Sequence, residues 1–220
     1  MRVGILGTGA LARSLGRVWS GAGHSVRITG RDPKHAAAAA EQIGLGAGVV
    51  DPARFASQVD VVVVAVAWDG LREALALVGA DQGTLAGKTV IDCTNAVDYA
   101  TGELKPGSAS AAELVAGTAV GAHAVKALHL FAGTSWPYAG PQDRAPVVVI
   151  CGDAPDAVEQ ASALIRDLGG RPALIAGLAG AGQAEEAAGF VMRVVAAGHN
   201  PRFAVPDVDP APSGTAATGG

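Results

Sequence analysis

Residues 2–12 read RVGILGTGALA, an apolar stretch that breaks at a glycine and runs on into helix-forming residues. The glycines and Ala12 fit the pattern Gly-x-Gly-x-x-Ala, which joins a strand to a helix where a dinucleotide binds. Gly7 permits the tight turn, Gly9 lets the backbone approach a pyrophosphate, and Ala12 lets the helix pack closely on the strand. The first helical turn offers free backbone N–H groups to the anion. We predict a dinucleotide site here; an ordinary glycine-rich turn is the alternative, because the chain has 31 glycines.

The composition allows one sizeable core and argues against several classes of partner. The 220 residues suffice for one domain, or one domain with a small second lobe. The net charge is −4 without a basic cluster, so we expect no nucleic-acid partner. No apolar run approaches a membrane span, and the N-terminus lacks a signal-peptide pattern. Cys93 and Cys151 lie far apart, which favours buried thiols in a cytoplasmic protein.

The end of the second strand indicates which dinucleotide binds. Residues 25–29 read SVRIT, so the strand ends in Thr29 and is followed by Gly30 and Arg31. At the end of this strand, NAD-binding forms carry an acidic residue that binds the ribose hydroxyls. A hydroxyl, a backbone N–H and a guanidinium suit a 2′-phosphate instead, so we predict NADP. The alternative for Arg31 is a solvated charge paired with the next aspartate. Lys34 adds to the phosphate site or faces water.

Two further strands place residues at the same edge of the sheet. Residues 60–66 form a β-branched run without alternation, typical of a central parallel strand covered on both faces. Ligands of such sheets lie beyond the carboxyl ends of the strands, so a dinucleotide would cross Val66, Ala67, Trp68 and Gly70. Trp68 is either a lid or a packing residue. After the strand at 88–93, Asn95 suits an amide or ribose contact, or it is a turn residue.

Residues 123–133 are predicted to form a strand that carries two histidines. A period of two places on one face the side chains of His123, Val125, Ala127, His129 and Phe131. His123 and His129 would lie about 20 Å apart along a strand, so they cannot share a metal ion, and no metal site is predicted. His129 lies at the carboxyl end, where chemistry is expected; a hydrogen-bonded structural histidine is the alternative. Lys126 is expected to face the other way and to reach solvent.

The remaining segments complete an α/β pattern. Polar residues 98–110 are expected to form a loop over the site. We expect a strand at 146–153, a helix to residue 168, an edge strand at 171–175, and a last helix at 183–197 with its inner side formed by Phe190, Val191, Val194 and Val195. The prediction is a Rossmann-type, doubly wound, mostly parallel sheet with a small C-terminal α/β extension. Residues 1–205 form one dinucleotide-binding domain that includes the acceptor site, and residues 206–220 form a disordered tail.

These motifs together resemble the F420-dependent NADP oxidoreductase family. The resemblance covers residues 1–190, and transmembrane ferric reductases share the same nucleotide domain. Its pieces are the N-terminal strand and turn through Leu11, Thr29-Gly30-Arg31, Val66-Ala67-Trp68, Val125-Lys126-Ala127-Leu128-His129, and Cys151-Gly152-Asp153.

The resemblance implies hydride transfer between the nicotinamide of NADP(H) and the deazaflavin of coenzyme F420, a small-molecule co-substrate. Phosphate contacts fall on the positions of Thr8, Gly9, Ala10, Leu11, Gly30 and Arg31. Further cofactor contacts fall on those of Val66, Gly70, Asn95, Ala132 and Gly133. His129 would lie against the deazaflavin, donating a hydrogen bond or balancing charge, and no acid–base set is required. The resemblance also implies a homodimer.

Two departures from the family pattern concern the acceptor side. Residues 176–183 read AGLAGAGQ, where family members usually carry proline, asparagine, serine and arginine. Ala67 stands where the family has a proline. The first departure keeps two other hypotheses open, and the change at Ala67 is the milder of the two. One is an NADPH-dependent reductase with another acceptor, such as a flavin, a ferric chelate or a C=N compound. The other is a non-catalytic NADP-binding or redox-sensing protein.

Overall fold

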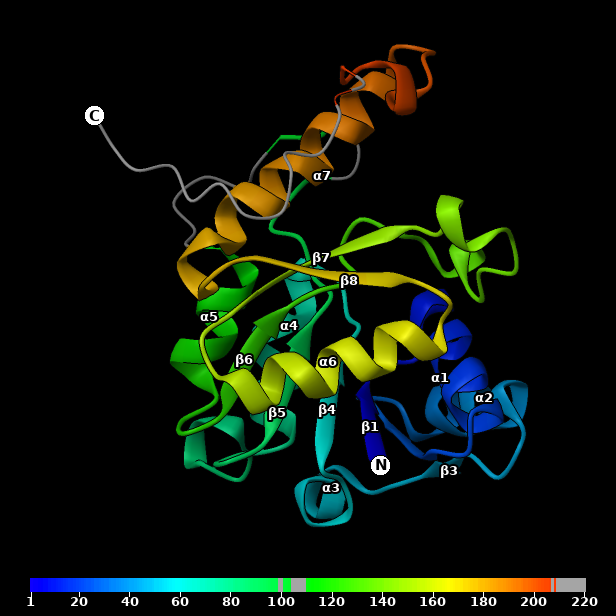
Figure 1. The fold of residues 1–220 in the computed structure, drawn as a ribbon. Helices are drawn as coiled ribbons and strands as arrows, with labels where there is room; N and C mark the ends of the chain where they lie inside the picture. The colour runs from blue at the N-terminus through cyan, green and yellow to red at the C-terminus, as the bar shows by residue number, and fades with distance from the viewer. Residues whose placement is uncertain (99–100, 104–109, 207, 209–220) are drawn as a thin grey trace.

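The computed structural model describes residues 1–98, 101–103, 110–206 and 208. Eight strands form one sheet in the order β3-β2-β1-β4-β5-β6-β7-β8. All neighbouring strands run parallel except β6 and β7, which are antiparallel. The first six strands follow the Rossmann order, and β7, α6 and β8 form the C-terminal α/β extension (Figure 1). The predicted fold class is confirmed.

The elements follow one another in βα alternation along most of the chain. The strands are β1 (Arg2–Leu6), β2 (Ser25–Thr29), β3 (Gly48–Val49), β4 (Val61–Val64), β5 (Thr89–Asp92), β6 (His123–Lys126), β7 (Val147–Gly152) and β8 (Arg171–Ala176). The α-helices are α1 (Ala10–Gly21), α2 (Pro33–Ile43), α3 (Pro52–Gln58), α4 (Leu71–Leu77), α5 (Ala111–Thr118), α6 (Pro155–Asp167) and α7 (Ala181–Ala196). Short 3-10 turns include η1 (Trp68–Gly70), η3 (Gly133–Ser135) and η6 (Pro201–Phe203).

The central strand β4 is buried on both faces, as its unbroken valine run predicts. One core cluster lies between the sheet and helices α1, α2 and α6. A second lies on the other face, under α3, α4 and α5. Trp19 is fully buried in the first cluster, where its indole Nε1–H donates to the carbonyl of Leu164 at 2.9 Å. This tryptophan therefore packs α1 against α6.

Strand β6 is shorter than predicted, which corrects the placement of His129. The strand ends at Lys126, and Leu128 adopts a φ of 61° in the left-handed region. The period of two therefore fails beyond this turn, and His129 lies in a loop, not on a strand face. Lys126 does not reach solvent as predicted, since its side chain is fully buried. Its charge is compensated inside the protein by the carboxylates of Asp92 and Glu185.

The predicted inner side of the last helix is wrong. The buried residues of α7 are Ala181, Ala184, Glu185, Ala188 and Gly189. Phe190 is 46% exposed and Val195 is 56% exposed. The C-terminal half of α7 projects from the body of the molecule (Figure 1), and these two apolar side chains stay exposed.

Some predictions fall largely outside the described residues. The predicted tail at 206–220 is described only at residues 206 and 208, and most of the predicted loop at 98–110 is likewise outside. Within the described part of the chain, no helix is both long and apolar enough to cross a membrane. No group of three or more potential ligands gathers for a metal ion among the same residues.

Candidate dinucleotide-binding site

The fingerprint turn after β1 has the geometry that its glycines predict. Gly7 has a φ of 128°, and a Cβ there would lie 2.2 Å from the carbonyl oxygen of Ala65. Its N–H donates to the carbonyl of Thr29 at 3.0 Å, which fixes the turn over β2. Gly9 is the N-cap of α1, and a Cβ there would meet no atom within 4 Å. The first turn of α1 is thus open to an anion.

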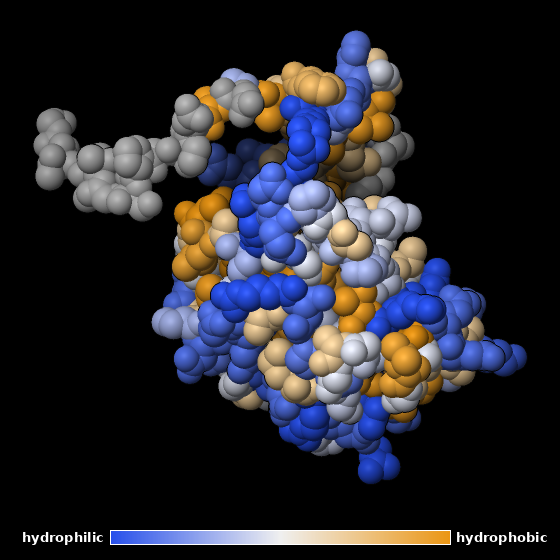
Figure 2. All heavy atoms as spheres, turned by 45° about the vertical axis from the view of Figure 1, so that its right-hand side comes forward, coloured by the Kyte–Doolittle hydropathy of each residue, from blue (hydrophilic) through white to orange (hydrophobic). Residues whose placement is uncertain are grey.

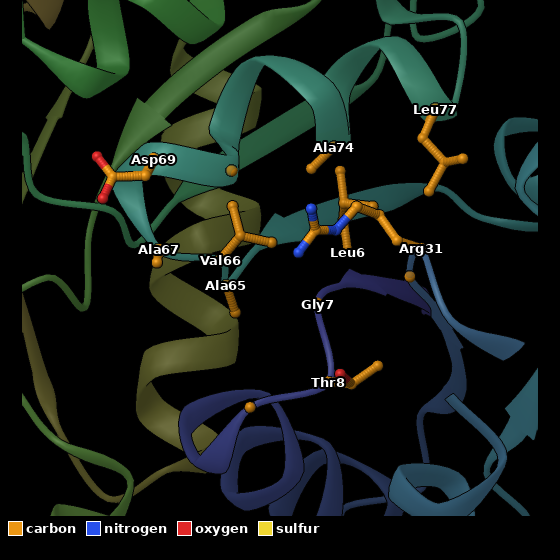
Figure 3. A pocket seen from close by; sticks show the side chains of 13 residues that line it. Leu6, Gly7, Thr8, Arg31, Ala65, Val66, Ala67, Asp69, Ala74 and Leu77 are labelled. Carbon is orange, nitrogen blue, oxygen red and sulfur yellow. The ribbon is translucent and has the colours of Figure 1, made fainter. Parts of the chain in front are cut away.

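A cavity of about 450 Å³ opens at the carboxyl ends of β1 and β4 (Figure 3). The chain order of the sheet reverses between these two strands, and doubly wound sheets bind dinucleotides at such a switch point. The cavity is lined by Leu6, Gly7, Thr8, Gly9, Gly30, Arg31, Ala65, Val66, Ala67, Asp69, Gly70, Ala74 and Leu77. Eight of these were predicted from the sequence as cofactor-binding residues: Gly7, Thr8, Gly9, Gly30, Arg31, Val66, Ala67 and Gly70.

Arg31 extends its guanidinium across the cavity (Figure 3). The alternative pairing with Asp32 does not form between these two described side chains, because the Asp32 carboxylate caps α2 instead. It accepts from the backbone N–H of Lys34 at 2.8 Å and of His35 at 3.4 Å. The end of β2 therefore presents a cation to the cavity, while the carboxylate of the adjacent Asp32 accepts hydrogen bonds from backbone N–H groups of α2.

Sequence reasoning missed five lining residues. Leu6 ends β1, Ala65 follows the last residue of β4, and Asp69 belongs to η1. Ala74 and Leu77 follow Gly70 at spacings of four and seven residues, which places them on one face of α4. That helical spacing is a signal that could have found them.

Other predicted residues do not line the cavity. Thr29 is buried, and its hydroxyl has no hydrogen-bond partner among the described residues. Lys34 is exposed on the first turn of α2. Trp68 is partly buried against the core under α4 and α5, which favours packing over a lid. The other predicted site residues outside the cavity lining are Ala10, Leu11, Asn95, His129, Ala132 and Gly133.

Gly133, which follows Ala132 at the start of η3, nevertheless lies against the fingerprint helix. Ser14 of α1 donates its hydroxyl to the carbonyl of Gly133 at 2.6 Å. A Cβ on Gly133 would approach the carbonyl oxygen of Ala10 to 2.9 Å. The structure thus brings η3 and the start of α1 together, as a shared cofactor site requires.

Asn95 and His129 are also brought together. The Asn95 amide Nδ2 donates to the carbonyl of His129 at 2.8 Å, and the His129 ring Nε2 lies 3.0 Å from the carbonyl of Ala184. Since a carbonyl only accepts, Nε2 carries the hydrogen and Nδ1 is an acceptor. Neither Nδ1 nor the Asn95 Oδ1 has a partner among the described residues.

Burial makes the imidazole of His129 neutral. Loss of hydration, together with the charge of Lys126, lowers the pKa of His129 to about 3. A neutral ring cannot balance a negative charge, and its one N–H is already donated to Ala184. The two roles inferred for His129, donating to the deazaflavin or balancing its charge, are therefore not available in this geometry; Nδ1 can accept a hydrogen bond.

Comparison with known proteins finds a family that matches the N-terminal part of the chain. Residues 2–96 match the model of a family described as NADP oxidoreductase, coenzyme F420-dependent. This part of the chain is therefore similar to that family. The description of the family names NADP, which agrees with the cavity at the switch point and with the cation at the end of β2.

Similar proteins extend the likeness over most of the chain. A structure from Arthrobacter sp. FB24, described as a candidate F420-dependent NADP reductase, is 25% identical with a TM-score of 0.78, covering 90% of this chain and 96% of the other. The metalloreductase STEAP3 of Rattus norvegicus is 34% identical over 185 residues, 84% of this chain. The chain spans only 36% of the length of that relative. A reductive aminase from Aspergillus terreus, solved with NADPH, shares the fold at 18% identity and a TM-score of 0.67, covering 90% of this chain and 63% of the other.

Proposed function

We propose that the protein transfers a hydride between NADP(H) and coenzyme F420. The observation that carries the NADP half is the cavity end formed by Thr8, Gly30 and Arg31, where a guanidinium stands in place of an acidic residue. The family match and the likeness to the Arthrobacter protein support the F420 half.

The residues of the cavity fit the adenosine and phosphate parts of NADP(H). The open first turn of α1, with Gly9 at its N-cap, would hold the pyrophosphate. Arg31 would hold the 2′-phosphate, and the apolar face of Ala74 and Leu77 would contact the adenine. When both groups are bound, the nicotinamide and the deazaflavin supply the hydride chemistry themselves.

The protein's own part in this chemistry is placement. The candidate site needs no nucleophile, because the reaction requires two rings held face to face away from water. Asn95 and the neutral His129 lie beyond β5 and β6, at the same carboxyl edge as the cavity. Their two unpartnered acceptor atoms suit N–H donors on a bound ring or carboxamide.

A second candidate is an NADPH-dependent reductase with another acceptor. The segment at 176–183, which leads from β8 into α7, carries one polar side chain, Gln183, where the family pattern has four polar or proline positions. The rat relative is named a metalloreductase, which makes a ferric chelate one acceptor to test; a flavin or a C=N compound are others. A non-catalytic NADP-binding protein is the remaining hypothesis.

The deciding experiment mixes the purified protein with NADPH and F420 and follows the visible absorbance of the deazaflavin. The proposal expects bleaching that depends on the protein and on NADPH. Absence of bleaching, with NADPH bound tightly, would rule out F420 as acceptor. The same assay with a ferric chelate, a free flavin and a cyclic imine then distinguishes another reductase from a protein that only binds NADP.

We also propose that the protein is a cytoplasmic homodimer. Along the projecting part of α7 and η6, an apolar groove of about 500 Å³ is lined by Phe190, Arg193, Val194, Ala197, His199, Asn200, Phe203 and Ala204. Figure 2 shows hydrophobic side chains at the surface of the projecting part of the molecule. A second copy would cover this groove. Cys93 and Cys151 are buried free thiols, as predicted, which agrees with a reducing compartment.

A further inference from the structure

A fully buried ion cluster lies at the carboxyl ends of β5 and β6. The Lys126 Nζ is 2.9 Å from an Asp92 carboxylate oxygen and 2.8 Å from a Glu185 carboxylate oxygen, and it also donates to the carbonyl of Thr94. All three side chains are at most 1% exposed. Buried ion clusters contribute little net stability compared with apolar residues of the same volume, so stability alone does not account for this one.

Glu185 uses its carboxylate to join three parts of the chain. Besides Lys126, it accepts from the backbone N–H of Ala96 at 3.1 Å and of Ala111 at 3.0 Å. Ala111 begins α5, so the positive end of that helix compensates the second carboxylate of the cluster. Burial opposes a charge on Lys126, but Asp92 and Glu185 together raise the pKa of Lys126 above its ordinary value. Lys126 therefore stays charged at neutral pH.

The cluster fixes the loop that carries Asn95. On one side, Thr94 donates its N–H to Asp92 at 3.0 Å and its carbonyl accepts from Lys126. On the other side, Ala96 is held by Glu185. Asn95 is therefore held from both neighbours in the chain.

The same turn of α7 also holds His129. Ala184, the residue before Glu185, accepts the ring N–H of His129 at 3.0 Å, and the carbonyl of His129 accepts from Asn95. Asn95, His129 and the start of α7 thus form one hydrogen-bonded unit, and its only charges among these described contacts are those of the cluster. Moving α7 would move both side chains.

We propose that Lys126 and Glu185 are positioning residues, whose ion cluster seats α7 on the carboxyl edge of the sheet and so sets Asn95 and His129 for hydride transfer. The proposal rests on the proposed function, because it assigns Asn95 and His129 to the reacting end of the cofactor. It assigns no contact between the cluster and NADP(H).

The test uses the triple variant Asp92→Asn, Lys126→Met, Glu185→Gln, which removes every charge of the cluster without leaving one unpaired. Such a neutral set is expected to fold, whereas a single substitution leaves a buried charge uncompensated. The matched control is Glu103→Gln, which breaks the exposed 3.2 Å ion pair that Glu103 forms with Arg193, a residue of α7 like Glu185.

In single-turnover reactions at saturating NADPH, the triple variant is expected to transfer hydride about tenfold or more slowly, because small displacements of reacting groups are costly. Its Kd for NADPH should stay within about threefold of the wild type, since it leaves the cavity and Arg31 intact. Glu103→Gln should match the wild type in both. A triple variant that transfers hydride at the wild-type rate, or one whose slower transfer is matched by Glu103→Gln, would overturn the proposal.

A second measurement needs no acceptor and separates this proposal from the proposed function. The emission maximum and anisotropy of bound NADPH report the surroundings of the nicotinamide. Both should change in the triple variant and not in Glu103→Gln. If wild-type protein does not reduce F420, the proposed function fails, and this measurement still decides the positioning role: unchanged emission and anisotropy in the triple variant would reject it.

Discussion

At the scale of the single residue, Arg31 decides between NADP and NAD. Arg31→Ala removes the cation that crosses the cavity, and a charge-assisted hydrogen bond contributes roughly 1.5–3 kcal/mol. We therefore expect the Kd for NADPH to rise roughly 10- to 150-fold, while the Kd for NADH changes little. Fluorescence titration with both cofactors measures this. Lys34→Ala is the control, since Lys34 lies outside the cavity; equal losses for NADPH and NADH in Arg31→Ala would refute the 2′-phosphate site.

His129 should make stability depend on pH. Its pKa is lowered in the folded protein to about 3 by burial, from an ordinary value of 6.5. The unfolded chain therefore binds the proton first, and stability falls as the pH drops from 6.5 towards 3. Between pH 7.5 and 5 the wild type should lose about 2 kcal/mol more than His129→Gln, whose amide can still donate to Ala184. Urea unfolding at both pH values measures the difference, and equal losses would contradict the buried, neutral imidazole.

At the scale of the element, the two fingerprint glycines should separate folding from binding. Gly7→Ala places a Cβ 2.2 Å from the carbonyl oxygen of Ala65 at a φ of 128°, so we expect a loss of about 2–4 kcal/mol of stability. Gly9→Ala meets no atom, so stability should be nearly unchanged. Its Cβ enters the space of the pyrophosphate, and the Kd for NADPH should rise about tenfold or more.

Thermal unfolding and NADPH titration of both variants carry the test. A Gly9→Ala protein that binds NADPH as tightly as the wild type would show that the pyrophosphate does not lie on this turn. A Gly7→Ala protein of unchanged stability would contradict the close approach of the turn to Ala65.

Elements whose residues obey a local rule could be predicted from the sequence. The valine run at 61–64 has no polar side to turn to solvent, so it predicts a strand buried on both faces. The fingerprint turn depends on backbone conformations that glycine adopts readily. The end of β6 could not be predicted in this way, because period two continues through Ala127 and His129 while the backbone turns at Leu128. Lys126, on the strand before that turn, meets two carboxylates: that of Asp92, its partner in β5, and that of Glu185, which is 59 residues away in sequence on α7.

At the scale of the whole molecule, the candidate site divides into a local part and a distant part. The half built on β1, β2 and β4 uses residues close to strand ends, and eight predicted residues line its cavity. The half near β5 and β6 depends on α7, whose first turns are held by Glu185 together with the small buried residues Ala181 and Ala184. A buried carboxylate within an alanine-rich helix gives no periodic signal, so the sequence predicted an inner face from Phe190 and Val195 that the fold leaves exposed.

That exposed face yields a prediction for the assembly. If a second copy covers the groove on α7 and η6, light scattering should give twice the 21.7 kDa of the chain. Phe190→Ser with Phe203→Ser should dissociate the dimer, because each substitution occurs twice in a two-fold interface. A buried aromatic anchor contributes about 2 kcal/mol or more to binding. Because each phenylalanine is lost from both copies, even one of the two substitutions raises the dimer Kd roughly a thousandfold.

Val120→Ser is the control for the dimer, since Val120 is 55% exposed but lies in the turn between α5 and β6 and not on the groove. It should leave the dimer intact. A wild-type mass of one chain would reject the homodimer, and a dimer that survives the paired phenylalanine substitutions would place its interface elsewhere. Dissociation without loss of NADPH binding would in turn show that each chain holds a complete nucleotide cavity, as the lining of that cavity by residues 6–77 of a single chain requires.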